Sequence, residues 1–242
     1  MRPTPAPIRC VLGVRGHGKS TVARQLVRDR RRLLVYDTRR EHEALPLSFT
    51  DFERYVDAVA ADGFSRPFRV AMTDIGFEED FCAIAWTVGE RLTALRGHDA
   101  RGTELTVFLD EADQVAQPGR EMPIFKRLAS QGRHNGIELV ACARRPVELS
   151  RLLTANADDL VLCRTQEPDD VRYLRSIIGD DAGAAVSELP RFECVRWSQE
   201  RWGRFRISPS GDLTPTGEGS VTASRDSDFP LTPPAGSDFV DP

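Results

Sequence analysis

Near the amino terminus, Ile8-Arg-Cys-Val-Leu12 runs directly into Gly13-Val-Arg-Gly-His-Gly-Lys-Ser20. The first five residues form a short apolar run that ends in glycine, which indicates a buried strand. Residues 20–30 carry apolar side chains on one face, which indicates a helix. The glycine-rich turn matches the pattern G-x-x-x-x-G-K-[ST] in full, and it stands between a strand and a helix, as phosphate binding requires.

The residue types in this turn suit the binding of a nucleoside triphosphate. Glycines let the backbone curl so that successive N–H groups point at phosphate oxygens, and the helix that follows directs its positive end to the same place. We expect Lys19 to neutralise the β- and γ-phosphates and the Ser20 hydroxyl to ligate Mg²⁺. The alternative is a chance match in a glycine-rich loop, which the flanking strand and helix make improbable. The expected nucleotide-binding residues are Gly13, Gly16, His17, Gly18, Lys19, Ser20 and Thr21, with His17 a tolerated loop residue rather than a catalyst.

A second buried run, Leu105-Thr-Val-Phe-Leu109, ends in the acidic pair Asp110 and Glu111. Open α/β sheets place their ligand sites at the carboxyl ends of strands. Asp110 is therefore suited to hold Mg²⁺ through a water molecule, and Glu111 to orient or deprotonate an attacking water. This pair favours hydrolysis over transfer to a small acceptor. The alternative is a solvated acidic turn, but a complete phosphate loop in the same chain favours the catalytic interpretation.

The wider pattern predicts an α/β domain. Further strands are expected near residues 33–36, 68–72, 105–109, 137–142 and 160–163, with helices near 81–95, 121–130 and 169–178. Strands that alternate with helices predict a mainly parallel sheet with helices on both faces. Together with the phosphate loop, this pattern resembles a P-loop NTPase fold of the RecA/ASCE type. The strand Phe68–Met72 falls between the phosphate loop and the acidic strand. By analogy of fold, an inserted strand is typical of ATPases with a catalytic glutamate.

The last fifty residues change in character. Residues 191–198 and 202–207 predict an antiparallel β-hairpin that carries several arginines and two tryptophans. Such a surface can track a nucleic-acid backbone, although a hairpin that covers the edge of the sheet is at least as well supported. After residue 207 the chain is rich in Pro, Gly, Ser, Thr and Asp, which predicts disorder. We therefore expect an ATPase domain over residues 1–207 and an acidic tail over residues 208–242.

Composition sets limits on the class of protein. The 242 residues are 40 % hydrophobic, and no run approaches the roughly 18 apolar residues of a membrane helix, so no integral membrane segment is expected. The amino terminus lacks a secretory signal, and five scattered cysteines predict buried thiols in a reducing cytoplasm. Net charge is −4; residues 208–242 carry −5, which leaves +1 for residues 1–207. That balance permits a nucleic-acid partner without demanding one.

Two arginines flank the predicted strand 137–142. Arg133 precedes it, away from its own subunit's phosphates, so it is placed to reach a nucleotide in a neighbouring subunit; such an arginine accelerates other phosphoryl transfers by about 10³–10⁵. Arg144 follows the strand, beside the acidic pair, and is placed to sense the γ-phosphate of its own subunit. The alternative for both is a surface ion pair or a helix cap, which composition alone favours.

With these motifs in place, residues 8–180 resemble the HerA/FtsK superfamily of ring-forming, nucleic-acid-translocating ATPases. Within it they are most similar to the genome-packaging ATPases of tailless, membrane-containing viruses. The phosphate loop is common to many families, so the region 131–170 separates this one from its relatives. The matching elements are Gly13–Ser20, Leu105–Glu111, Gly132–Gly136, Ala141–Pro146, Asn156–Arg164 and Glu167–Asp170.

This resemblance implies hydrolysis of ATP with Mg²⁺, a hexameric ring and double-stranded DNA as the translocated substrate. It implies a finger role for Arg133, whereas a glutamine usually stands where this sequence has Arg144. A viral protein of this kind would work in the host cytoplasm or on the virion, with a capsid or membrane-vertex protein as its docking partner. Two alternatives stay open: a filamentous-phage assembly ATPase related to zonula occludens toxin, which generally carries a transmembrane segment, and a non-motor ATP-binding switch.

Overall fold

The computed structural model describes residues 5–42, 45, 52–64, 66–96, 103–198 and 201–216. The strands are β1 (Ile8–Leu12), β2 (Arg32–Tyr36), β3 (Phe68–Met72), β4 (Leu105–Leu109), β5 (Ile137–Ala143), β6 (Asp159–Cys163), β7 (Glu193–Ser198), β8 (Arg201–Ile207) and β9 (Leu213–Pro215). The helices are α1 (Lys19–Val27), α2 (Phe52–Ala61), α3 (Glu78–Arg96), α4 (Ala112–Val115), α5 (Pro123–Gln131), α6 (Arg151–Thr154), α7 (Pro168–Ile178) and α8 (Asp180–Ser187). Short 3₁₀ helices are η2 (Gly132–Asn135) and η3 (Pro146–Glu148).

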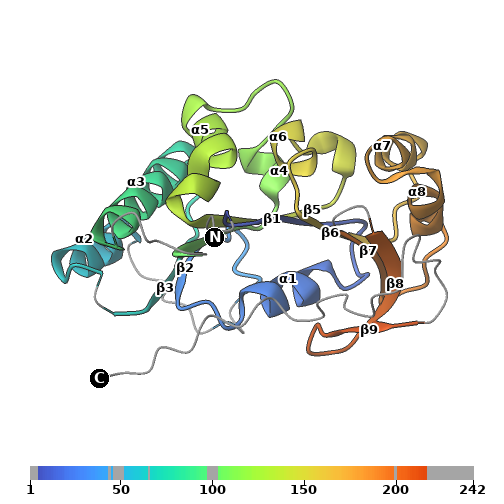
Figure 1. Ribbon diagram of the computed structural model, residues 1–242, viewed down its shortest axis with the longest axis horizontal. Helices are drawn as coiled ribbons and strands as arrows, with labels where there is room; N and C mark the ends of the chain where they lie inside the picture. The colour runs from blue at the N-terminus through green and yellow to red at the C-terminus, as the bar shows by residue number, and fades with distance from the viewer. Residues whose placement is uncertain are drawn as a thin grey trace.

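The strands form one sheet in the order β3-β2-β4-β5-β1-β6-β7-β8-β9 (Figure 1). Every pairing from β3 to β6 is parallel, so the carboxyl ends of β1, β4 and β5 meet at one edge. The strand inserted between the phosphate-loop strand and the acidic strand is β5. The prediction for Phe68–Met72 is wrong in this respect, because β3 lies at the outer edge of the sheet beside β2. Order along the chain does not set order across a sheet, since each crossover connection can skip a neighbour.

Helices cover both faces of the sheet, as the alternating pattern predicts. Figure 1 shows α1 on one face and α3, α5 and α6 on the other. Val11, Phe108 and Val140 point to the α1 face, where they pack with Val22 and Ala23 of that helix. The neighbouring residues Leu12, Leu109 and Leu139 of the same strands point to the opposite face. There they join the core that also contains Phe81 of α3 and Phe125 of α5. All five cysteines are buried and free, as their scattered positions in the sequence predict.

The carboxyl-terminal hairpin forms as predicted, and a third strand continues it. β7 runs antiparallel to β6, and β8 runs antiparallel to β7. β9 then pairs with β8 at Ile207 and Leu213. The expectation of disorder directly after residue 207 is therefore wrong for residues 208–216, while residues 217–242 lie outside the described part of the chain. In the turn, Ser208 Oγ accepts a hydrogen bond from the Asp212 N–H at 3.0 Å, a local contact that composition does not reveal.

The turn between β8 and β9 is docked on α1. Gly211 has φ +94°, and a Cβ atom there would lie 2.5 Å from the carbonyl oxygen of Thr21 and 2.7 Å from Cβ of Gln25. The Gln25 side chain also donates a hydrogen bond to Asp212 at 2.7 Å. The hairpin is thereby held against the helix that follows the phosphate loop.

Helices α2 and α8 were not predicted from the sequence. In α8, Gly183 faces Arg175 of α7 so closely that an added Cβ would lie 2.7 Å from the Arg175 backbone nitrogen. Glycine is a poor helix former, so the helical state of this segment depends on its packing against α7 rather than on local propensity. No helix in the described part of the chain combines the length and the hydropathy needed to cross a bilayer.

Substitution of Gly211 tests the docking of the β8–β9 turn on α1. We expect Gly211→Ala to lower the free energy of unfolding by about 2 to 4 kcal/mol, because it adds a steric clash to the cost of a positive φ. The measurement is urea denaturation followed by circular dichroism. Gly63→Ala is the matched control, since Gly63 has φ +66° but an added Cβ meets nothing within 4 Å. Its expected cost is about 1 to 2 kcal/mol. Equal losses for the two variants would show that the turn is not tightly docked.

Candidate active site

The phosphate loop adopts a conformation that depends on its glycines. Gly13, Gly16 and Gly18 have φ values of +130°, +80° and +98°. A Cβ atom at Gly13 would lie 2.6 Å from the carbonyl oxygen of Cys163, so the end of β1 runs directly against the end of β6. The Val14 N–H donates to the carbonyl of Arg164 at 2.9 Å. The loop is therefore anchored to the neighbouring strand as well as to its own helix.

Lys19 lies inside the curl of the loop. Its side chain is mostly buried, and Nζ donates a hydrogen bond to the carbonyl oxygen of Val14 at 3.1 Å. The His17 ring instead turns to the carbonyl of Arg15, at 3.1 Å from Nδ1. The ammonium group of Lys19 is thus held against the loop backbone, with little solvent around it.

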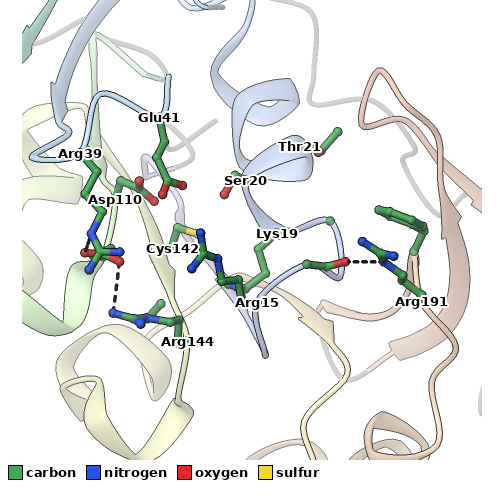
Figure 2. Close-up of a pocket in the computed structure, with 15 residues that line it drawn as sticks. Arg15, Lys19, Ser20, Thr21, Arg39, Glu41, Asp110, Cys142, Arg144 and Arg191 are labelled. Carbon is green, nitrogen blue, oxygen red and sulfur yellow. Dashed lines mark hydrogen bonds and ion pairs between the residues drawn. The ribbon is translucent and has the colours of Figure 1, made fainter. Parts of the chain in front are cut away.

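The loop and the acidic strand end face one open cavity of about 250 Å³ (Figure 2). Of the residues expected to bind nucleotide, Gly16, Gly18, Lys19, Ser20 and Thr21 line it, whereas Gly13 and His17 do not. The expected carboxylates and the arginine of the β5 exit line it too: Asp110, Glu111 and Arg144. The remaining lining residues are Arg15, Arg39, Glu41, Cys142, Ala143, Arg191 and Phe192. The described residues thus bring together cations, two hydroxyls and three carboxylates in one cavity.

Asp110 is held from two sides at the end of β4. Its N–H donates to the carbonyl of Tyr36 on β2 at 3.0 Å, and its side chain is almost fully buried. The fully buried His42 places Nε2 3.0 Å from the Asp110 carboxylate, although the angles are not those of a hydrogen bond. Asp37 in turn accepts the N–H groups of Glu41 and His42 and so fixes that turn. The Asp110 carboxylate therefore has a defined position on the lining of the cavity.

Glu111 sits between two arginines. Arg39 Nε lies 2.9 Å from one carboxylate oxygen, and Arg144 Nη2 lies 3.2 Å from the other. The backbone at Glu111 has φ +51°, an uncommon conformation for a residue with a side chain. Burial raises the pKa of the Glu111 carboxyl above its usual value, while the two guanidinium groups act in the opposite direction. A carboxylate with a raised pKa accepts a proton more readily, as a general base must.

The sequence analysis did not identify Arg39 and Glu41 as site residues, although both follow directly after a predicted strand. They follow β2, which pairs in parallel with β4, so their carboxyl-end position is equivalent to that of Asp110 and Glu111. The strand order was needed to recognise this equivalence. Phe192 was also missed, and Arg191 was assigned to the hairpin rather than to the nucleotide site. Arg191 Nε donates to the carbonyl of Gly16 at 2.9 Å, which joins the hairpin to the phosphate loop.

Arg133 lies at the opposite edge of the sheet. It belongs to η2, directly before the amino end of β5, and one guanidinium nitrogen contacts Asp158 at 3.2 Å. Asp158 also accepts the N–H of Ile8 at the amino end of β1. The phosphate loop follows the carboxyl end of that same strand, so the length of the sheet separates Arg133 from the cavity of its own subunit.

Comparisons with known proteins agree with this architecture. No protein-family profile matches the chain. A curated relative, Protein P9 of Pseudoalteromonas phage PM2, is 25 % identical over 146 residues, which are 59 % of this chain and 62 % of the phage protein. The chain therefore spans less than two thirds of that relative.

Solved structures share the fold at low sequence identity. The genome packaging NTPase B204 of Sulfolobus turreted icosahedral virus 2, in complex with AMPPCP, superposes with a TM-score of 0.66 at 17 % identity, over 83 % of this chain and 97 % of that one. VirB4 of Thermoanaerobacter pseudethanolicus superposes with a TM-score of 0.55 at 11 % identity, over 83 % and 89 % of the two chains. The chain therefore has a P-loop NTPase fold, and the resemblance to the FtsK/HerA-type ATPases is confirmed as a likeness of fold.

Proposed function

We propose that this chain is a Mg²⁺-dependent ATPase that acts in an oligomeric ring and moves double-stranded DNA, with viral genome packaging as its biological work. The single observation that carries the ATPase part is the shared cavity of the phosphate loop and the carboxylate pair. The fold shared with a viral genome packaging NTPase and the match to a phage protein support the rest. The host cytoplasm or the virion, with a capsid or membrane-vertex protein for docking, belongs to the same proposal.

The residues present fit a magnesium-bound triphosphate. Glycines at positive φ leave the loop N–H groups facing inward, and Lys19 supplies a buried positive charge among them. Ser20 and Asp110 offer the oxygen donors that Mg²⁺ prefers, and both line the cavity. When bound, the metal would neutralise charge that develops on the phosphates. Both residues were expected to serve the metal, and their placement together supports that assignment.

The chain's own residues supply the remaining chemistry. Lys19 exchanges the Val14 carbonyl for phosphate oxygens and neutralises part of their charge. Glu111 orients a water molecule and takes its proton as the water oxygen bonds to the terminal phosphorus and the phosphoanhydride bond breaks. Arg144 holds one oxygen of Glu111 and lines the end of the cavity where that phosphate would lie. Its guanidinium can therefore contact the γ-phosphate, at the position where the resemblance to HerA/FtsK ATPases implies a glutamine.

Substitution of Lys19 and Glu111 separates binding from hydrolysis. We expect Lys19→Ala to weaken ATP binding by about 10- to 100-fold, because it removes a charge-assisted contact in a buried loop. Glu111→Gln keeps ATP affinity and lowers turnover by about 10²- to 10⁴-fold, because it removes the base. Calorimetry and phosphate release measure the two effects. The controls are Lys126→Ala and Glu90→Gln, which alter an exposed lysine and a well-exposed glutamate on the outer helices. Full turnover by Glu111→Gln would contradict the assignment of the base.

The position of Arg133 supports a site completed by a second subunit. The residue precedes the amino end of β5 and contacts Asp158, whereas the cavity of its own subunit lies at the carboxyl end of that strand. Its side chain is 28 % exposed, which leaves the guanidinium accessible to a neighbouring molecule. A ring in which each subunit presents this edge to the next cavity would make Arg133 the trans finger.

A mixing experiment tests this arrangement. Arg133→Ala alone is expected to lose hydrolysis by about 10³-fold or more while it keeps ATP affinity. Arg133→Ala mixed with Glu111→Gln is expected to recover part of the activity, because some interfaces then combine an intact Glu111 with an intact Arg133. Asp158→Asn serves as the control for a structural role of the ion pair, and it should lower stability without abolishing turnover. Absence of recovery on mixing, with Asp158→Asn as inactive as Arg133→Ala, would show that Arg133 is structural.

DNA dependence distinguishes the motor from its alternatives. We expect double-stranded DNA to stimulate ATP hydrolysis more than single-stranded DNA of equal length. The stimulation should weaken as salt rises, because phosphate contacts release counterions. Electron microscopy with duplex DNA and a non-hydrolysable ATP analogue should show rings. Greater stimulation by single strands would favour the filamentous-phage assembly ATPase, and no response to either would favour a non-motor switch.

A further inference from the structure

The cavity has two chemically different ends. Figure 2 shows Asp110, Arg39 and Arg144 on one side of Lys19 and Arg191 on the other. The first end holds Glu111, the proposed general base for hydrolysis, and the residues proposed above to contact the γ-phosphate. The second end is made by the segment that enters β7, where Arg191 and Phe192 line the cavity beside the phosphate loop. No carboxylate is among the described lining residues from that segment.

Phe192 has a strained backbone conformation at this end of the cavity. Its φ is +62°, a conformation that a bulky side chain rarely adopts, and 45 % of the residue is exposed. The backbone is held in this state by a hydrogen bond from the Ile207 N–H to the Phe192 carbonyl at 2.8 Å. The ring packs at the loop, with Cδ1 3.5 Å from the position of a Cβ at Gly18. Strain and exposure together in one aromatic residue are features of functional sites rather than of a core.

Arg191 connects this ring to the loop. Its Nε donates to the carbonyl of Gly16 at 2.9 Å, and its guanidinium carbon lies 4.9 Å from the centroid of the Phe192 ring. The guanidinium therefore lies over the Phe192 ring, and the pair presents a flat cationic group and a flat aromatic group at this end of the cavity. Nucleobases stack on both kinds of surface.

The direction of the bound triphosphate follows from the chemistry at the first end. Hydrolysis needs the terminal phosphate next to Glu111, so the α-phosphate and the nucleoside must extend from the loop in the other direction. That direction leads past Gly18 to the entry of β7. The nucleoside thus leaves the loop where the aromatic ring and the guanidinium are exposed.

We propose that Arg191 and Phe192 form the nucleobase subsite, with the base stacked against the Phe192 ring and its neighbouring guanidinium. This inference rests on the proposed nucleotide site and adds the part that recognises the base. Stacking tolerates any base, since every base has a π-face, so the subsite selects the presence of a base more than its identity. ATP and GTP are both expected to bind, with affinities within about tenfold of each other.

The test compares a nucleotide with its base-free counterpart. Binding of ATP and of inorganic tripolyphosphate, each with Mg²⁺, is measured by calorimetry on the full chain. Phe192→Leu should weaken ATP binding by about 5- to 100-fold, the range for loss of one stacked base, and leave tripolyphosphate binding unchanged. Phe192→Tyr should restore ATP affinity because it restores the ring. Phe77→Leu is the matched control, since Phe77 is 47 % exposed but is not among the lining residues.

A second substitution distinguishes loss of the aromatic ring from loss of the folded structure. Phe192→Gly accepts the positive φ without strain and removes the ring, so it should reproduce the selective loss of ATP binding with an unchanged thermal midpoint. Unchanged ATP affinity in both ring-removing variants would overturn the subsite, as would equal losses for ATP and tripolyphosphate. If wild-type protein bound neither ligand, the proposed function itself would fail, whereas binding of both ligands with selective loss in the variants supports both proposals.

Discussion

The parallel register of β4, β5 and β1 brings the phosphate loop and the acidic strand end to the same edge of the sheet. β5 pairs with β1 along one side and with β4 along the other, so the phosphate loop and the acidic pair leave the sheet at the same edge, one strand apart. That spacing leaves room for Lys19 and Ser20 to face Asp110 and Glu111 across a single cavity. A shift of one residue in either pairing would turn each buried side chain to the other face of the sheet and move these groups apart.

The cavity is completed by segments that are distant in the chain. The loop after β2 supplies Arg39, and the entry to β7 supplies Arg191 and Phe192. Each segment makes a specific contact with the phosphate loop or the acidic strand end: Arg39 forms an ion pair with Glu111, and Arg191 donates a hydrogen bond to the Gly16 carbonyl. The β8–β9 turn, docked on α1 at Gly211, holds the hairpin against the helix whose amino end supports the phosphate site.

Backbone strain is concentrated at the two ends of this cavity. Of the four described non-glycine residues with positive φ, Glu111 and Phe192 both line it. Strained residues persist where the surrounding structure holds them, and they gather at sites that bind or react. Here Glu111 is held by two arginines and Phe192 by backbone pairing with Ile207. The preference of non-glycine residues for negative φ is thus overcome by tertiary contacts at Glu111 and Phe192. These are the two places where the proposed hydrolysis and the proposed nucleobase recognition need a side chain in the cavity.

The sequence alone predicts the phosphate loop, most strands and the main helices, and it names Lys19, Ser20, Asp110, Glu111 and Arg144, all of which line one cavity in the structure. Local motifs and periodicity suffice for these, because each depends on neighbours within a few residues. The folded chain adds three features that the sequence does not reveal: β5 rather than β3 is the inserted strand, β9 extends the sheet beyond residue 207, and Arg39 and Phe192 line the cavity. Those features depend on strand order and on crossover connections, which bring together residues far apart in the chain and leave no local periodicity to read.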